Sequence, residues 1–176
     1  MVKNYYYLLK ERISDFYRSI LQYRDKAVIP LDEEIAVVKN YYYLLKERFG
    51  TNLKLSVSIK EEEAYVPPLA IQMLVENAIK HNIVSAQKPL HIFIEQDEKG
   101  FLEVRNTLQP KRIRPKSTSF GLSSIIARFA LLSSNRVKIE EKNGEFRVLL
   151  PLIKSKYRNQ VVDPARLEQI EGELEK

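Results

Sequence analysis

The chain has 176 residues, of which 44% are hydrophobic and 30% charged, and its formal net charge is +6. We expect one soluble globular domain with helical extensions, because no run approaches the ~20 apolar residues of a membrane-spanning helix. The chain contains no cysteine, which excludes disulfides, thiolate metal sites and cysteine nucleophiles. Its densest basic cluster, KRIRPK at 111–116, has no interleaved aromatic residues, so a nucleic-acid interface is not indicated.

One segment, VKNYYYLLKER, occurs twice without change, at 2–12 and at 38–48. Natural repeats drift in sequence, so an unaltered copy is typical of a recent duplication or of an engineered chain. The copy at 38–48 has the surroundings of native sequence. We therefore interpret residues 1–12, which repeat the 37–48 region from Val2 onward, as a grafted or artefactual segment.

Two apolar seams, with spacings of three and four residues, predict a helix from about residue 2 to 25 and a second from Leu31 to Arg48. Pro30 separates the two helices, and Gly50 ends the second. Either seam could pack on the sheet or form an interface between two chains. The first seam comprises Val2, Tyr6, Leu9, Ile13, Phe16, Ile20 and Tyr23, and the second comprises Leu31, Ile35, Val38, Tyr42, Leu45 and Phe49.

The rest of the chain alternates strand and helix patterns. Gly100 and the Asn143-Gly144 pair predict the turns of two hairpins. His91 lies at the start of a strand and is expected to be structural, because no partner for metal binding or base catalysis lies near it in sequence. The predicted strands are 53–59, 91–96, 101–106, 136–142 and 145–151, and the predicted helices are 69–82, 121–133 and 164–176, with a loop at 107–119.

The stretch LVENAIKHN at 74–82 carries the strongest functional pattern. At the helical period, one side is apolar and the other bears Asn77, Lys80 and His81. Asn is unfavourable inside a helix by roughly 0.5 kcal/mol relative to Ala. A carboxamide oxygen can bind a hard metal ion and the two basic groups can meet phosphate, although an amphipathic helix with a solvated Glu76–Lys80 pair explains the same pattern.

LVENAIKHN resembles the asparagine box of the GHKL ATPases, in the form found in LytS-like sensor histidine kinases. The resemblance extends from about 13 to 153, including the segments at 14–50, 66–82 and 120–132. It implies a Bergerat-type α/β fold, an α+β two-layer sandwich whose mixed, mostly antiparallel sheet follows N-terminal helices. The implied division is 1–50 for those helices, 51–153 for the ATP-binding domain and 154–176 for the tail.

The resemblance also implies a site for ATP and Mg²⁺. Asn77 matches the magnesium ligand, and Lys80 and His81 match the basic positions. Asn106 stands at the acidic residue for the adenine amino group and Leu108 at a glycine, so weaker binding is expected. The Gly-x-Gly-Leu turn is represented by Ser119, Gly121 and Leu122.

The family's phosphoacceptor histidine is absent, because residues 1–12 occupy the place of the segment that carries it. The resemblance therefore implies the catalytic part of a two-component kinase, which transfers phosphoryl to a histidine elsewhere. The alternative is a pseudokinase with a degenerate nucleotide site that acts as a dimerising module. Implied partners are a second copy, bound through the N-terminal helices, and a response regulator. The implied location is the cytoplasm, with any membrane anchor outside this chain.

Overall fold

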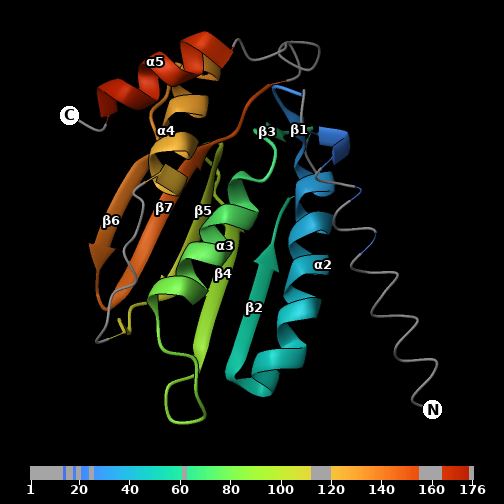
Figure 1. The fold of residues 1–176 in the computed structure, drawn as a ribbon, viewed down its shortest axis with the longest axis vertical. Helices are drawn as coiled ribbons and strands as arrows, with labels where there is room; N and C mark the ends of the chain where they lie inside the picture. The colour runs from blue at the N-terminus through green and yellow to red at the C-terminus, as the bar shows by residue number, and fades with distance from the viewer. Residues whose placement is uncertain are drawn as a thin grey trace.

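A layer of helices covers one face of a five-stranded sheet in the computed structural model (Figure 1). The structure describes residues 14, 18, 21–23, 26–60, 63–111, 120–154 and 164–174. The strand order is β2 (Leu53–Ser58), β4 (Leu90–Gln96), β5 (Phe101–Thr107), β7 (Glu145–Pro151) and β6 (Lys138–Lys142). The helices are α2 (Leu31–Phe49), α3 (Ala70–His81), α4 (Phe120–Leu132) and α5 (Pro164–Leu174), and η1 (Gly50–Asn52) is a short 3-10 turn.

In the five-stranded sheet, three of the four strand pairings are antiparallel, and β2 and β4 run parallel. The prediction of a mixed, mostly antiparallel sheet is therefore confirmed. Both hairpins turn where expected: Gly100 has φ 79°, and Asn143 and Gly144 have φ 55° and 74°, as a type I′ turn requires. The sequence analysis missed a small sheet that pairs β1 (Ile29–Pro30) with β3 (Tyr65–Val66).

Helix α2 begins directly after Pro30, and the backbone N–H of Gly50 caps it by donating to the Lys46 carbonyl. Its seam faces inward: Leu31, Ile35 and Val38 are buried in the main core, and the later seam residues pack against that core. The second seam is thus a packing surface of the domain itself. The division predicted at residue 50 stays an expectation, since α2 shares the core of the segment that follows it.

Most of the first predicted seam lies outside the described residues. Tyr23 is the exception, and it is buried in a small cluster with Ile29 and Val37.

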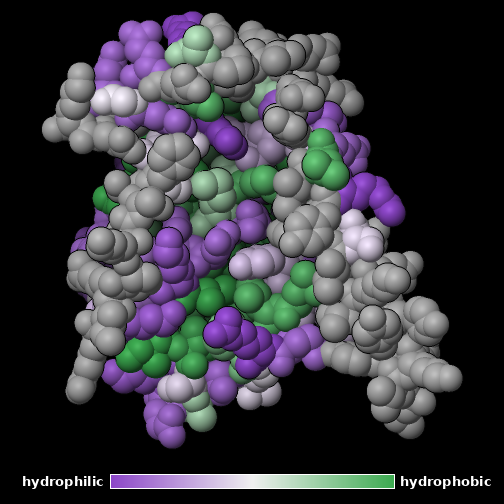
Figure 2. Space-filling view, viewed as in Figure 1, coloured by the Kyte–Doolittle hydropathy of each residue, from purple (hydrophilic) through white to green (hydrophobic). Residues whose placement is uncertain are grey.

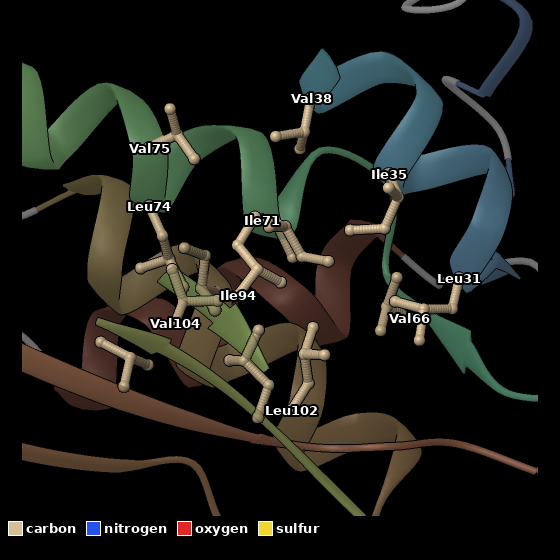
Figure 3. Close-up of a cluster of buried hydrophobic side chains, with 14 of the residues drawn as sticks. Leu31, Ile35, Val38, Val66, Ile71, Leu74, Val75, Ile94, Leu102 and Val104 are labelled. Atoms are coloured by element: carbon tan, nitrogen blue, oxygen red, sulfur yellow. The ribbon is translucent and has the colours of Figure 1, made fainter. Parts of the chain in front are cut away.

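The core lies between the helices and the facing side of the sheet (Figure 3). Helix α3 contributes Ile71 and Leu74, which point toward Ile94 of β4 and toward β5, and Val75, which is also buried but points away from Ile94 (Figure 3). Burying a large aliphatic side chain stabilises the fold by about 1.5–3 kcal/mol. The apolar side of α3 is therefore buried in the core, and its opposite side is available to bind a ligand.

The outward surface of the helix layer mixes hydrophilic and hydrophobic side chains (Figure 2). Helix α5 packs against α4 at one end of the molecule (Figure 1). Among the described helices, none is long and apolar enough to cross a membrane.

Candidate nucleotide site

Helix α3 carries three of the predicted site residues on its less buried side. Asn77, Lys80 and His81 are half-buried, whereas Ala78 and Ile79 between them face the core. The Asn77 carboxamide makes no hydrogen bond with another described residue. Its oxygen is therefore available as a ligand for a hard cation.

The first turn of α4 lies against Asn77. A methyl carbon built on Gly121 would be 3.6 Å from Asn77 Nδ2 and 3.6 Å from Met73 Cε, which is ordinary contact distance. Gly121 lies within the helix and has no positive φ, so the backbone conformation does not require glycine here. Its lack of a side chain instead keeps the space beside Asn77 open. Leu122 packs against the core, and Ser119 lies outside the described residues.

Unpaired N–H groups at a helix N-terminus favour bound anions. Because Gly121 lies close to Asn77, the first turn of α4 is next to a candidate metal ligand. This arrangement suits a phosphate group that carries a divalent cation. A single protein ligand is sufficient for Mg²⁺, which usually retains waters and takes further oxygens from substrate phosphates. The described residues include no cluster of three or more His, Cys, Asp or Glu side chains that could hold a metal by themselves.

Asn106 is buried near the end of β5, on the same side of the strand as Leu102 and Val104. Its Nδ2 donates to the Thr107 carbonyl at 2.7 Å, which leaves its oxygen as an acceptor. Leu108, at the position of a family glycine, continues the strand edge, because its N–H donates to the Gly144 carbonyl at 2.8 Å. These placements are compatible with an uncharged acceptor for an amino group.

Polar contacts fix the C-terminal end of α3 to the chain that follows β5. The Asn82 carboxamide is buried, donates to the Ala78 carbonyl at 2.9 Å and accepts from the Gln109 N–H at 2.7 Å. Lys111 Nζ donates to the Ile79 and Lys80 carbonyls, both at 2.9 Å. The loop predicted at 107–119 is therefore anchored at its first residues to the helix that carries Asn77.

A buried carboxylate that the sequence analysis missed caps the other end of α3. Glu34 of α2 accepts from the backbone N–H groups of Leu69, Ile71 and Gln72 at 2.8, 3.0 and 3.2 Å. Burial raises the pKa of Glu34 to about 7, although these hydrogen bonds and the charge of Arg128 oppose the rise. One sequence feature could have indicated it: VPPLA at 66–70 has no Ser, Thr, Asp or Asn to cap the helix.

Arg128, in α4, donates to the Pro68 carbonyl at 3.1 Å and so ties α4 to the turn that begins α3. Ser124 is buried on the same helix. His91 is held in the sheet as expected: Ser56 Oγ lies 2.9 Å from its Nε2, and its ring stacks on Phe93. Burial lowers the pKa of His91, and the charges of Lys54 and Arg105 lower it further.

Known proteins match this chain in sequence and in fold. The family model described as "Histidine kinase" matches residues 2–53. The sensor protein LytS of Enterococcus faecalis is 30% identical over 138 residues, which cover 69% of this chain and 23% of that protein. The sensor histidine kinase/phosphatase LytS of Staphylococcus aureus is 33% identical over 134 residues, or 75% of this chain and 21% of that protein. The chain thus spans less than a quarter of the length of these curated relatives.

The catalytic domain of histidine kinase ThkA, solved in a nucleotide-free form, superposes with a TM-score of 0.51. The superposition covers 70% of this chain and 95% of that domain at 18% identity, so the likeness is one of fold. The sequence matches and the likeness in fold together define a protein of the histidine kinase class. The chain belongs to the histidine kinases, and within them it is a relative of the LytS-like sensor kinases.

Proposed function

We propose that this chain is the ATP-binding catalytic segment of a two-component sensor histidine kinase. The observation that carries the proposal is the half-buried Asn77 carboxamide beside the first turn of α4. It combines an oxygen ligand for magnesium with a helix terminus that favours phosphate. The sequence relationship to LytS-like kinases supports the same function.

In this proposal Asn77 holds Mg²⁺, and Lys80 and His81 meet the phosphate oxygens. When bound, Mg²⁺ would offset part of the negative charge of the phosphates. The amides at the start of α4, including those of Gly121 and Leu122, orient the phosphate chain. Phosphoryl transfer depends mainly on such positioning and charge stabilisation, so these groups would carry most of the protein's share of the chemistry.

The adenine amino group would donate to the Asn106 oxygen. A neutral acceptor forms a weaker hydrogen bond than the carboxylate expected there from the family. Leu108 replaces a glycine beside it. We therefore propose that nucleotide binding is weaker than in kinases that keep the acidic residue and both glycines.

The acceptor of the phosphoryl group is proposed to be a histidine that this chain does not supply. His91 is fixed in the sheet, and His81 ends the helix that would hold the nucleotide. A response regulator is the proposed recipient in the full system, and a second copy is the proposed partner through the N-terminal helices. A cytoplasmic location stays a prediction.

Calorimetric titration with Mg-ATP and Mg-ADP tests the proposed site. The parent chain is expected to bind both nucleotides, and EDTA is expected to weaken binding. Asn77→Ala should fold normally, because Ala is favourable in a helix, yet lose about tenfold or more in affinity. Asn135→Ala removes an exposed carboxamide outside the site and is the matched control.

Equal nucleotide affinity in Asn77→Ala and the parent chain would refute the assignment of the site. A parent chain that binds neither nucleotide at millimolar concentration would refute the proposed function. That second result would favour a pseudokinase that has lost its nucleotide site.

A further inference from the structure

Helix α3 depends on another helix for its N-terminal cap. Leu69 occupies the N-cap position with φ 63° and offers no side-chain hydrogen bond. The Glu34 carboxylate supplies it instead, with Oε2 accepting from Leu69 and Oε1 from Ile71 and Gln72. Glu34 is 0% exposed, so water does not compete for these donors. A negative charge at this end also complements the helix dipole.

The opposite end of α3 is capped by a cation from a third segment. Lys111 Nζ donates to two of the last carbonyls of the helix, those of Ile79 and Lys80. The Lys111 N–H also donates to the His81 carbonyl at 3.0 Å. A positive charge complements the dipole at this end. Both ends of the helix that carries Asn77 are therefore held by charged groups from outside the helix.

An α-helix rises about 1.5 Å and turns about 100° per residue. A short, well-packed helix moves as a unit, so a shift by one residue displaces all its side chains by that translation and rotation. A slip of α3 by a single residue would therefore turn the Asn77 side chain away from Gly121. Errors of about 1 Å in the position of a ligand are costly in catalytic and metal sites. The groups that prevent this slip at the two ends thus control the site without touching its ligand.

We propose that Glu34 and Lys111 form a two-ended clamp that sets the axial position of α3 and thereby the affinity of the site for magnesium nucleotide. The inference rests on the proposed function. Glu34 and Lys111 are positioning residues, since they act through the backbone of α3. The clamp also couples α2 and the residues after β5 to Asn77, so a displacement of either segment would change nucleotide binding.

The experiment measures the affinity for Mg-ADP at pH 8 in Glu34→Gln, in Lys111→Met and in the double variant. Each single variant is expected to raise Kd about threefold to tenfold, because a smaller fraction of the protein has α3 correctly placed. Lys111→Arg keeps a cationic donor and should return Kd to within about twofold of the parent. The matched controls are Asp32→Asn and Lys88→Met, which remove the same charges from exposed positions.

Hydrogen exchange of backbone amides tests the coupling between the two ends without nucleotide. Glu34→Gln is expected to speed exchange of the Asn82 N–H, which donates to the Ala78 carbonyl at the far end of α3. Lys111→Met is expected to speed exchange at Ile71 and Gln72. A purely local cap would change exchange at its own end only.

Two results would overturn the clamp: a Kd in Lys111→Met within twofold of the parent, or exchange that changes only at the substituted end. If Glu34→Gln does not fold, Lys111→Met and Lys111→Arg decide by themselves. If the parent chain binds no Mg-ADP, the proposed function and the effect on affinity both fall. The exchange measurements then still decide whether the two ends of α3 are coupled.

Discussion

Gly121 lies where an added methyl group would touch the candidate metal ligand. The methyl carbon would be 3.6 Å from Asn77 Nδ2, a distance that the fold tolerates. We expect Gly121→Ala to leave the free energy of unfolding unchanged or to raise it by up to about 1 kcal/mol, as Ala is the better helix former. Mg-ADP affinity should fall, because the methyl group occupies the space beside Asn77. Urea unfolding and calorimetry measure the two effects separately.

A loss of stability in Gly121→Ala would contradict this prediction, because it would mean that the added methyl group clashes with Asn77. Gly172→Ala is the matched control, because Gly172 lies in α5 with open space around it. That substitution should stabilise its helix without changing nucleotide affinity.

Glu34 is expected to make stability depend on pH. Its pKa in the folded chain is about 7, raised by burial from an ordinary value of 4.5. Between these values the folded state binds more protons than the unfolded state, so the Glu34 contribution to the free energy of unfolding falls as pH rises from 4.5 to 7. The total change is on the order of 3 kcal/mol. Arg128 and Tyr23 are the ionisable groups near it on other segments.

Chemical unfolding of the parent and of Glu34→Gln across this pH range checks the expectation. The free energy of unfolding of the parent, relative to that of Glu34→Gln, should fall as pH rises to 7 and stay constant above pH 7. Asp32→Asn, which changes an exposed carboxylate in the same helical turn, should keep the pH dependence of the parent. A constant difference over the whole range would contradict the raised pKa.

Across three strands of the sheet, charged side chains form a ladder centred on Arg105. Its guanidinium bonds Glu145 at 2.8 Å and Glu95 at 3.2 Å, and lies 3.9 Å from the centre of the Phe93 ring. Arg105 and Glu145 side chains are each 18% exposed. Arg105→Met should therefore lower the free energy of unfolding by about 1–2 kcal/mol at pH 7.

This loss should shrink at pH 3. Burial raises the pKa of Glu145, but the hydrogen bond from Arg147 and the charge of Arg105 outweigh it, so the pKa is lowered overall. A lowered carboxyl pKa gives stability above its ordinary value of 4.5 that disappears as pH falls through the folded pKa. Lys99→Met, in an exposed turn, is the control. An equal loss at both pH values would assign the effect to packing on Phe93 instead.

At the scale of the elements, periodicity together with turn and helix-breaking residues predicted α2 to α5 and the five strands of the main sheet. The hairpin at Asn143-Gly144 was predicted because its turn needs two residues with positive φ, which is a local property. The strands β1 and β3 were missed, since two residues are too few to show a period. The second seam was assigned to the core only by the structure, because a helical stripe does not indicate what covers it.

The whole chain is expected to form a homodimer through residues 2–25. The predicted seam there is rich in aromatic residues, and burying it in an interface would remove apolar surface from water. Analytical ultracentrifugation at about 30 micromolar should show a dimer, and deletion of residues 2–12 should shift it toward monomer by shortening the interface. Unchanged Mg-ADP affinity in the deleted chain would confirm that the domain remains folded. A monomer before and after deletion would contradict the prediction.

The sequence by itself predicted the asparagine-box helix, because its amphipathic pattern is a local property, and the fold class and the nucleotide site came from the resemblance of that helix and its neighbours to the GHKL ATPases. The tertiary structure decided what holds that helix. Glu34 is 37 residues from Ile71, and Lys111 is 31 from Lys80. Glu34 and Lys111 would suit a solvent-exposed helix or loop equally well. Only the packing of α2 and of the chain after β5 against α3 brings their charged groups to unpaired backbone groups. Burial makes the pairing of Glu34 obligatory, whereas Lys111 is half-buried.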